Sequence, residues 1–406
     1  MPKIKIVWLC HFTNTEVQSL LPLWRKRQPE FAFWIPNMLK GFEMREDIEI
    51  HVISPHIYLK RSTNIKLRNI HYHFIPLGIP LVHLRWPKFF EFDIISNYRL
   101  YRKKVKKTIY KIQPDIIDLI GAENVFYSSS ILDFKNVYPI SVTIQGFISQ
   151  LKDELKSSFE LRKRIAVEEQ ILKSFKYYAG EQDSSTYIST YNPNHVFFKL
   201  YGPVSETLAL NTTNDGKKYD CVYFGKLSKI KGAEDFIKVI AEIKTKKPEI
   251  KACVLGGGNA NPLLALAIEL NCSENIEFKG YVETQKELFE YVKASKVFLV
   301  PPYFERLSST IREAMFLKVP IVAYATGGIP YINEFDENIY LVKTGDYQEM
   351  AIKTLLLLEN ESLRTNLAEK AYQYALQEYS LKVNVERLIS AYQIIINNNN
   401  NEWHEF

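Results

Sequence analysis

The sequence predicts an α/β protein with two parallel sheets, one in each half of the chain. Short runs rich in β-branched residues alternate with helical stretches throughout, and this alternation is typical of parallel sheets covered by helices. A chain of 406 residues suits two domains of roughly 200 residues, each with its own core. The polar stretch Asn211–Lys218 is the best candidate for the linker. We therefore expect two Rossmann-like domains that face each other across a central cleft.

Each half holds apolar runs that we expect to form strands, because they are short and rich in residues that favour extended backbone. In the first half the expected strands are Ile4–Cys10, Ile48–Ser54, Ile70–Leu77, Asp115–Ile120, Ile140–Gln145 and His195–Leu200. In the second half they are Tyr219–Phe224, Lys251–Leu255, Ile276–Lys279, Val297–Val300, Ile321–Tyr324 and Ile339–Val342. Residues 397–406 begin with five asparagines, so we expect a disordered tail there.

The composition, 46% hydrophobic and 24% charged residues, is that of a soluble globular protein. No apolar run approaches the ~18–20 residues of a membrane span, and Ile4–Cys10 is too short for a signal peptide. The four cysteines are widely spaced, so we expect neither zinc nor disulfides, and a reducing cytoplasm. A net charge of +6 fits phosphate ligands or a lipid surface, and no nucleic-acid partner is expected.

The segment 303–329 joins two apolar runs at a place where a parallel sheet would bind a phosphate ligand. Ligands bind beyond the carboxyl ends of parallel strands, where helix N-termini attract phosphate. Glu305 and Glu313 stand eight positions apart, on either side of a helix start expected at about Ser309. Glu305 would lie in the loop, and Glu313 in the first helical turn, facing the same crevice. Two local alternatives remain: Glu313 as part of a capping box, and Gly327-Gly328 as a simple tight turn.

This segment resembles the E-x7-E region of retaining glycosyltransferases of family 4, which have the GT-B fold. The family's usual text is Glu-Gly-Phe-Gly-Leu before the helix and Glu-Ala-Met-x-x-Gly-x-Pro-Val-Val after it. Glu313-Ala-Met and Val319-Pro-Ile-Val match this text. Arg306, Ser308 and Lys318 stand where the family usually has glycine, although capsule-type bacterial members also carry polar residues there.

The resemblance implies two domains that bind different substrates. Residues 1–205 would bind the acceptor and residues 206–380 the nucleotide-sugar donor. A helix at about 381–396 would pack back on the first domain, as in many GT-B proteins. The resemblance is specific over Tyr219–Val342 and only general over the first half.

The same resemblance implies the catalytic residues. Gly225-Lys-Leu and Lys231-Gly stand where the family has Gly-Arg-Leu and Lys-Gly, whose two cations neutralise the donor diphosphate. Lys226 and Lys231 would therefore stabilise the leaving group, because preorganised charges lower the barrier as its negative charge grows. Glu305 would contact the donor sugar near the reacting carbon, and Glu313 the ribose hydroxyls. The alternative for the two lysines is a solvated lysine-rich turn.

Further donor contacts would come from loops that follow strands. Gly256 opens a triple glycine, which is also consistent with a plain turn. Gly280-Tyr-Val282 matches the family's Gly-x-Val segment, whose backbone usually meets the base, so uracil and guanine are not distinguished. The predicted donor-binding residues are Glu313, Gly225, Leu307, Ser308, Ser309, Gly256 and Val282.

The acceptor side departs from the family. Gln145 stands where members often carry a histidine, and the first loop, which contains Asn14, lacks the usual glycines. An amide takes no proton at neutral pH, so Gln145 is at most a hydrogen-bonding group. Front-face transfer, in which the departing phosphate takes the acceptor's proton, does not need such a base. Gln145, Glu123 and Asn14 are the expected acceptor or sugar contacts, and Gln145 has the alternative of bonding a loop at its strand end.

Two basic segments suggest peripheral membrane contact. Trp24–Trp34 joins cations to aromatics, and Arg102–Lys107 is a second basic cluster. Aromatic and basic neighbours suit an anionic membrane, but an exposed helix face explains them equally well.

We therefore expect a retaining, hexosyltransferase-type enzyme that moves a sugar from a nucleotide-diphosphate sugar to a glycan or lipid-linked glycan in surface polysaccharide synthesis. No cofactor or metal is expected, since the chain has no Asp-x-Asp. One alternative is a sugar-nucleotide epimerase of the same fold, which would turn over the donor without an acceptor. Another is a catalytically inactive sugar-nucleotide-binding partner protein, which would bind the donor without transfer.

Overall fold

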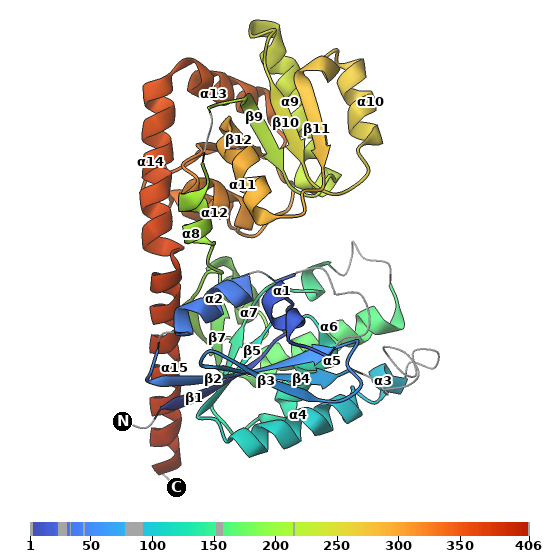
Figure 1. The fold of residues 1–406 in the computed structure, drawn as a ribbon, viewed down its shortest axis with the longest axis vertical. Helices are drawn as coiled ribbons and strands as arrows, with labels where there is room; N and C mark the ends of the chain where they lie inside the picture. The colour runs from blue at the N-terminus through green and yellow to red at the C-terminus, as the bar shows by residue number, and fades with distance from the viewer. Residues whose placement is uncertain are drawn as a thin grey trace. The chain divides into compact units, whose positions relative to one another are not determined.

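The computed structural model describes residues 3–22, 31–32, 34–43, 45–77, 92–151, 157–213 and 216–404. The chain forms two compact units: unit 1 is Met1–Gly202 with Asn384–Phe406, and unit 2 is Pro203–Val383. The first crossing between them falls at Gly202–Pro203, ahead of the polar stretch that we expected to be the linker. Each unit has its own sheet and core (Figure 1).

The described part of unit 1 contains an eight-stranded sheet in the order β3-β4-β2-β1-β5-β6-β7-β8. Among these described strands, the β3–β4 pair alone is antiparallel. The strands are β1 (Ile4–Leu9), β2 (Ile48–His56), β3 (Thr63–Leu67), β4 (Ile70–Pro76), β5 (Ile116–Ile120), β6 (Ile140–Thr143), β7 (Tyr177–Gly180) and β8 (Val196–Lys199). All six strands expected in this half are present, whereas β3 and β7 were not predicted.

The helices of unit 1 cover this sheet and bury apolar stripes against it. In α4, for example, Tyr101, Val105 and Ile109 are buried at a spacing of four residues, and the lysines between them face outward. The α-helices of this unit are α1 (Thr15–Ser19), α2 (Trp34–Phe42), α3 (Phe92–Ile95), α4 (Arg99–Ile112), α5 (Val125–Ser128), α6 (Phe159–Ser174) and α7 (Asp183–Ser189). The 3-10 helices are η2 (Ser129–Phe134) and η3 (Ser149–Leu151).

The last helix, α15 (Leu381–His404), is fixed to the centre of the unit 1 sheet by buried hydrogen bonds. Trp8 Nε1 donates to the Tyr392 hydroxyl at 2.9 Å, and that hydroxyl donates to Asp118 Oδ2 at 2.5 Å. Thr143 Oγ1 donates to the same carboxylate at 2.9 Å. Burial raises the pKa of Asp118 to about 6, against the effect of these bonds. Asp118 is therefore a structural anchor inside the core.

The tail prediction is wrong for most of its length, because α15 continues to His404. Asn398 Nδ2 donates to the Tyr177 hydroxyl at 3.3 Å, so the asparagine-rich segment also contacts β7. This contact gives a physical reason for the helix to continue through residues of modest helix propensity.

The described part of unit 2 contains a six-stranded, all-parallel sheet in the order β11-β10-β9-β12-β13-β14. The strands are β9 (Tyr219–Phe224), β10 (Ala252–Leu255), β11 (Ile276–Gly280), β12 (Ser295–Val300), β13 (Ile321–Tyr324) and β14 (Tyr340–Val342). The chain moves outward from β9 to β11 and then returns to β12 on the other side of β9. This doubly wound order places a topological switch point between β9 and β12.

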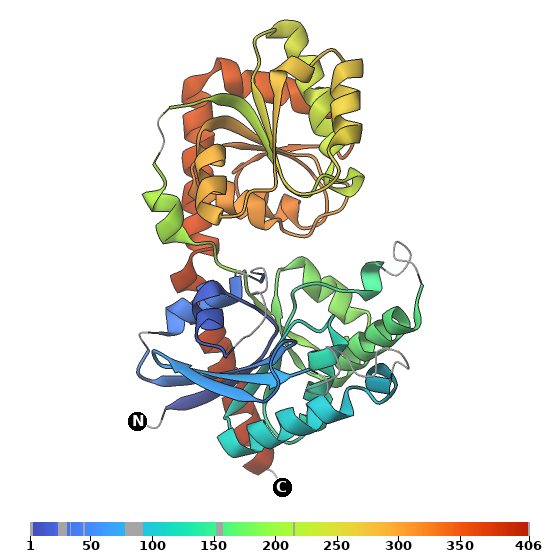
Figure 2. The ribbon, with the colours of Figure 1, turned by 45° about the vertical axis from the view of Figure 1, so that its right-hand side comes forward.

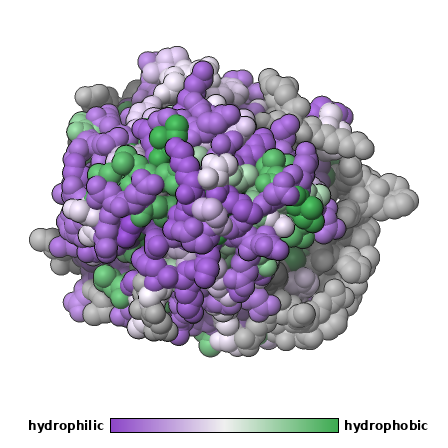
Figure 3. Space-filling view, turned by 90° about the horizontal axis from the view of Figure 1, so that it is seen from above, coloured by the Kyte–Doolittle hydropathy of each residue, from purple (hydrophilic) through white to green (hydrophobic). Residues whose placement is uncertain are grey.

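Helices lie on both faces of the unit 2 sheet (Figure 2). The α-helices are α8 (Glu206–Asn211), α9 (Ala233–Lys246), α10 (Asn261–Glu269), α11 (Gln285–Lys293), α12 (Ser309–Phe316), α13 (Tyr347–Glu359) and α14 (Glu361–Glu378). The 3-10 helices are η4 (Lys229–Lys231), η5 (Ser273–Asn275) and η6 (Ile329–Asn333). The face in Figure 3, seen from above, is mostly hydrophilic, with small separate hydrophobic patches. Because the sheet is doubly wound, a ligand site in unit 2 is expected at the carboxyl ends of its strands.

Candidate functional site

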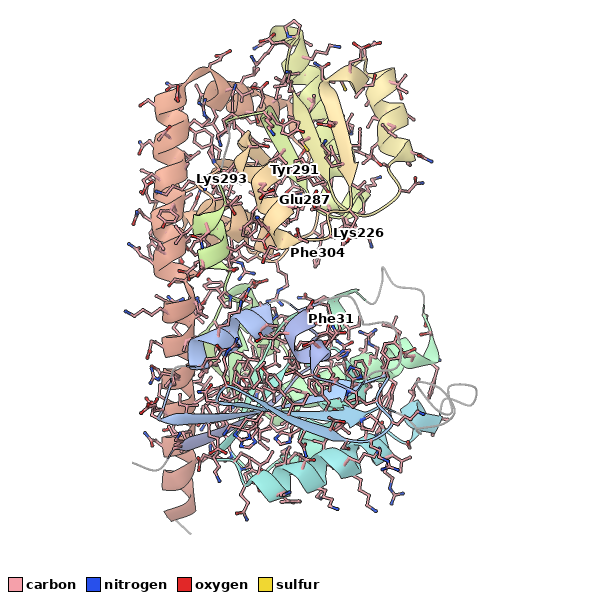
Figure 4. The ribbon with its side chains drawn as sticks, in the orientation of Figure 1. Phe31, Lys226, Glu287, Tyr291, Lys293 and Phe304 are labelled. Atoms are coloured by element: carbon pink, nitrogen blue, oxygen red, sulfur yellow. The ribbon has the colours of Figure 1, made fainter. Side chains whose placement is uncertain are left out.

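The candidate site lies at the switch point of unit 2, where β9 and β12 end side by side. Gly225 and Lys226 follow β9, and Glu305 follows β12 after a short loop. Figure 4 labels Lys226 and Phe304 in these two loops, at the same edge of the sheet. Open parallel sheets bind ligands at this position, so the sequence-based placement of Lys226 and Glu305 agrees with the topology.

Two glycines hold the neighbouring loops against the loop that carries Glu305. Gly232 has φ +72°, and a Cβ there would lie 1.6 Å from the carbonyl oxygen of Pro301. Gly327 has φ +56°, and a Cβ there would lie 1.6 Å from the carbonyl oxygen of Glu305. No side chain fits at either distance, so both positions require glycine. Gly327 is therefore more than a turn residue, because it allows the loop after β13 to touch the backbone of Glu305.

The loop after β10 is packed against the loop after β9 in the same way. A Cβ at Gly256 would lie 1.8 Å from the carbonyl oxygen of Gly225. The Leu227 N–H also donates to the Gly257 carbonyl at 2.9 Å. This packing alone explains the glycine at position 256, which we had expected to bind the donor.

The two lysines of the loop after β9 differ in their surroundings. Lys231 Nζ donates to Glu305 Oε2 at 2.8 Å, and the two side chains are 35% and 19% exposed. An ion pair this open to water is worth only ~0–1 kcal/mol, so giving it up for contacts with a ligand costs little. Lys226 is exposed, and no ion pair of Lys226 is found in the described residues.

Tyr223, which was not predicted from the sequence, contacts the loop that carries Lys226 and Lys231. Its buried hydroxyl lies 2.8 Å from the Lys226 carbonyl, to which it donates, and 3.3 Å from the Lys231 carbonyl. The two lysines are thus held at the two ends of one short loop. The signal in the sequence was a tyrosine just before the strand ends, which is indistinguishable from an ordinary core aromatic.

Glu313 lies further along its helix than expected. Helix α12 begins at Ser309 with Ser308 as its N-cap, so Glu313 is the fifth helical residue and not part of the first turn. A capping box would need the glutamate at the third position, so this alternative is wrong. Glu313 Oε1 instead accepts a hydrogen bond from Gln285 Nε2 of α11 at 2.9 Å.

The half-buried position of Glu313 changes its chemistry. Burial raises the pKa of the carboxyl to about 7, although the Gln285 hydrogen bond and the Arg312 charge both favour the ionised form. Glu313 is therefore poised between its neutral and ionised states near neutral pH. A ligand hydroxyl that donates to it would favour the ionised state.

The remaining expected donor contacts differ in how far their side chains reach solvent. Leu307 and Ser308 are each 7% exposed, whereas the side chain of Ser309 is exposed. Ser308 Oγ lies 2.7 Å from Thr310 Oγ1, so its hydroxyl has a local partner. Val282 is half-buried in the loop after β11. Donor contacts of Leu307 and Val282 would therefore be made largely by backbone.

In unit 1, Gln145 follows β6, and its Nε2 is buried without a hydrogen-bond partner among the described residues. The next part of this loop is held by Glu168, which accepts from the N–H groups of Ile148 and Ser149 at 2.9 Å each. Burial raises the pKa of Glu168. One alternative was that Gln145 itself bonds this loop. Its Nε2 makes no such bond among the described residues, and Glu168 accepts the hydrogen bonds of the loop instead.

Glu123 and Asn14 both have local contacts in unit 1. The Glu123 carboxylate lies over Gly121, and Asn124 Nδ2 donates to Glu123 Oε1 at 3.2 Å. Asn14 is the N-cap of α1, and its Oδ1 accepts from the Val17 N–H at 2.8 Å. The structure therefore gives Asn14 a helix-capping role, and acceptor contact by either residue stays a prediction.

The two basic segments are described unequally. Trp24, Arg25, Lys26 and Arg27 lie outside the described residues, whereas Trp34 begins α2. In α4, Arg102 is bound to Asp133, with a distance of 2.8 Å from Nε to Oδ2, and Lys103, Lys106 and Lys107 are exposed. No helix in the described part of the chain is long and apolar enough to cross a membrane. Across the same residues, no group of three or more His, Cys, Asp or Glu side chains is arranged to hold a metal ion.

The part of the chain that carries this site is similar to known proteins. Residues 205–374 match the family described as glycosyl transferases group 1. N-acetyl-alpha-D-glucosaminyl L-malate synthase of Bacillus anthracis is 25% identical over 174 residues, which are 43% of this chain and 44% of the relative. An uncharacterized glycosyltransferase of Methanocaldococcus jannaschii is 22% identical over 384 residues, covering 89% of this chain and 94% of the relative. This chain spans less than half the length of the first curated relatives that it matches.

Solved structures show that the fold extends over the whole chain. Sucrose-phosphate synthase from Thermosynechococcus elongatus matches with a TM-score of 0.73 at 15% identity, covering 98% of this chain and 100% of that one. Anabaena HepE in complex with UDP matches with a TM-score of 0.66 at 15% identity and the same coverage. The protein has the GT-B fold, and its residues 205–374 match the family of glycosyl transferases group 1.

Proposed function

We propose that the protein is a retaining, metal-independent glycosyltransferase that takes a sugar from a nucleoside-diphosphate sugar. Unit 2 would hold the donor, and unit 1 would supply contacts to a glycan or lipid-linked glycan acceptor in surface polysaccharide synthesis. The observation that carries this proposal is the 2.8 Å contact between Lys231 Nζ and Glu305 Oε2 at the switch point.

The charges at this contact suit the bond that must break. A glycosyl phosphate splits into a phosphate that gains negative charge and a sugar that gains positive charge. Lys231 offers a cation to the first fragment, and Glu305 offers an anion to the second, within one hydrogen-bond length of each other. Charges fixed in place before the reaction stabilise such a transition state more than the ground state. Lys226, which has no ion pair among the described residues, adds a second cation for the diphosphate.

The nucleotide would be bound by the loops beside this pair. Glu313 is placed to accept from ribose hydroxyls, and the backbone after β10 and β11 is available to the base. HepE of Anabaena binds UDP and UDP-glucose. We therefore propose a UDP-sugar as the first donor to test.

The acceptor proposal rests on relatives and on the surface of α4. Curated relatives include a Staphylococcus aureus poly(ribitol-phosphate) alpha-N-acetylglucosaminyltransferase, 27% identical over 162 residues. Another, from Campylobacter jejuni, acts on an undecaprenol-linked sugar and is 28% identical over 169 residues. The exposed lysines of α4 would attract the anionic lipids that surround such an acceptor.

The test is a donor screen by thermal shift, followed by turnover of the donor that binds. Wild-type protein should be stabilised by one of the UDP-, GDP- or ADP-sugars, because ligand that binds only the folded state raises the melting temperature. It should then release nucleotide diphosphate, and Glu305→Gln should bind the donor with little release. No stabilisation by any donor, or equal release by the variant, would refute the assignment.

The inactive binding protein remains a second candidate because of Gln145. Its amide stands where relatives often carry a proton-accepting histidine, and it cannot serve as a base. That candidate predicts donor binding by wild type with no release of nucleotide diphosphate under any acceptor condition. The screen above therefore separates the two functions.

A further inference from the structure

A buried carboxylate lies beneath the loop that carries Glu305. Asp235, in the first turn of α9, is 2% exposed and accepts hydrogen bonds from three side chains of the described residues. The Tyr303 hydroxyl donates to Oδ2 at 2.6 Å, the Tyr324 hydroxyl to Oδ2 at 2.9 Å, and Lys238 Nζ to Oδ1 at 3.0 Å. These bonds and the N-terminus of α9 compensate for the cost of burying a charge.

One of these donors belongs to the catalytic loop itself. Tyr303 lies two residues before Glu305, between the end of β12 and the carboxylate. Its N–H donates to the Ile230 carbonyl at 2.8 Å, next to Lys231, and its carbonyl accepts from Thr326 Oγ1 at 3.3 Å. Tyr303 therefore ties the Glu305 loop to the lysine loop, to α9 and to the loop after β13.

We propose that Asp235 and Tyr303 are positioning residues that hold Glu305 beside Lys231. The proposal rests on the proposed function and deepens it, because it names the contact that sets the geometry of the charge pair. The Asp235–Tyr303 hydrogen bond holds one side of the loop that carries Glu305. The backbone contact at Gly327 limits the movement of the same loop on its other side. Displacement of Glu305 by about 1 Å is enough to slow transfer strongly, since reacting groups must be held in near-attack geometry.

The second tyrosine supplies a matched control. Tyr324 donates to the same oxygen of Asp235 but belongs to β13, where it is fully buried in the core. Tyr303 is 45% exposed, and the hydrogen bond to Asp235 raises the pKa of its hydroxyl to about 12. Replacing either tyrosine with phenylalanine removes one donor from Asp235 and leaves the others. Only Tyr303→Phe releases the loop, so loss of stability and loss of position can be measured separately.

The experiment compares Tyr303→Phe and Tyr324→Phe in the full chain. Tyr303→Phe should lower kcat by roughly tenfold to a hundredfold, with the Kd for UDP within about twofold of wild type. Amide hydrogen exchange over residues 302–306 should become faster in this variant. Tyr324→Phe should lower the melting temperature at least as much, yet leave kcat and the exchange of these amides within about twofold of wild type.

The two variants distinguish a positioning role of the Asp235–Tyr303 hydrogen bond from a general structural role of Asp235. Equal losses of kcat in both variants would mean a general structural role for Asp235, and wild-type kcat in Tyr303→Phe would mean that the bond positions nothing. Unchanged exchange over residues 302–306 in Tyr303→Phe would also overturn the proposal. The exchange measurement needs no donor, so it still tests the loop contact if wild type turns over no sugar nucleotide. That last result would instead contradict the proposed function.

Discussion

The carboxyl edges of the two sheets are built differently, although both sheets are doubly wound. In unit 2, close glycine contacts lock the loops after β9, β10, β12 and β13 to one another, and these loops carry a fixed arrangement of charge. In unit 1, the polar residues beyond the strands mostly serve their own loops, as Asn14 caps α1 and Glu168 holds the loop after β6. Under the proposed function, the donor presents a diphosphate and a ribose whatever its sugar, whereas acceptors vary. We therefore propose that the locked edge of unit 2 binds the donor and that the locally built edge of unit 1 binds the acceptor.

Replacing one glutamate with glutamine at each sheet edge should give the largest difference between the two units. Glu305→Gln should lower kcat by about 10²–10³-fold with little change in UDP affinity, because its charge acts mainly in the transition state. Glu123→Gln, the control at the unit 1 edge, should change the apparent KM for the acceptor more than kcat. Steady-state kinetics with calorimetric titration of UDP measures both. Equal losses of kcat would remove the distinction between the two edges.

Glycine substitutions should reveal the difference in rigidity. Gly327→Ala should lower the free energy of unfolding by ~1–3 kcal/mol, because its Cβ would overlap the Glu305 carbonyl. Gly146→Ala in unit 1 should change it by less than ~0.5 kcal/mol, since nothing lies within 4 Å of a Cβ there. Urea unfolding of both variants is the measurement. A harmless Gly327→Ala would show that the loops of unit 2 are not locked.

Glu313→Gln should weaken UDP binding by ~1.5–3 kcal/mol through loss of a charged hydrogen bond. The pH dependence sharpens this prediction, because the pKa of Glu313 is raised to about 7. Ribose hydroxyls favour the ionised carboxylate, so the advantage of wild type over Glu313→Gln should shrink as pH falls below 7. Calorimetric titration of UDP from pH 6 to 8 tests this. An unchanged dissociation constant would exclude Glu313 from the site.

In the unliganded protein, the stability of wild type relative to Glu313→Gln should have the opposite dependence on pH. A carboxyl with a raised pKa binds its proton more tightly when folded, so its contribution to stability is complete below the ordinary pKa of 4.5. That contribution is lost as the pH rises to about 7. The stability of wild type relative to Glu313→Gln should therefore fall between these pH values. A flat difference would mean that Glu313 is not buried as described.

Membrane contact should be the weakest effect and should belong to unit 1. Liposome flotation with anionic lipid should show salt-sensitive binding, reduced by about 1 kcal/mol for each charge removed from Lys103, Lys106 and Lys107. The same comparison with Arg25, Lys26 and Arg27 changed to alanine tests the other basic segment. Equal partition onto neutral lipid would contradict an electrostatic surface.

The sequence allowed most of the strands to be predicted, because strands leave local signals. Strand β3 was missed because its residues alternate with polar side chains at a sheet edge, and β7 because it is four residues long and ends in glycine. Glu305 and Lys231 were assigned from their positions after strands together with the resemblance to family motifs, and their roles stay predictions. The Asp235–Tyr303 contact joins residues 68 positions apart, and only tertiary packing brings them together. The expected helix start at about Ser309 agrees with α12, but Glu313 is its fifth residue and lies just beyond the first turn.

The proposed function requires that fixed protein charges in unit 2, without a metal, drive transfer with retention of configuration. The most direct test follows sugar release or transfer from the donor found in the screen by NMR, in excess chelator, and records the anomeric configuration first formed. We expect full activity in chelator and the same anomeric configuration as in the donor. An inverted product, or activity that returns only with Mn²⁺ or Mg²⁺, would exclude this mechanism.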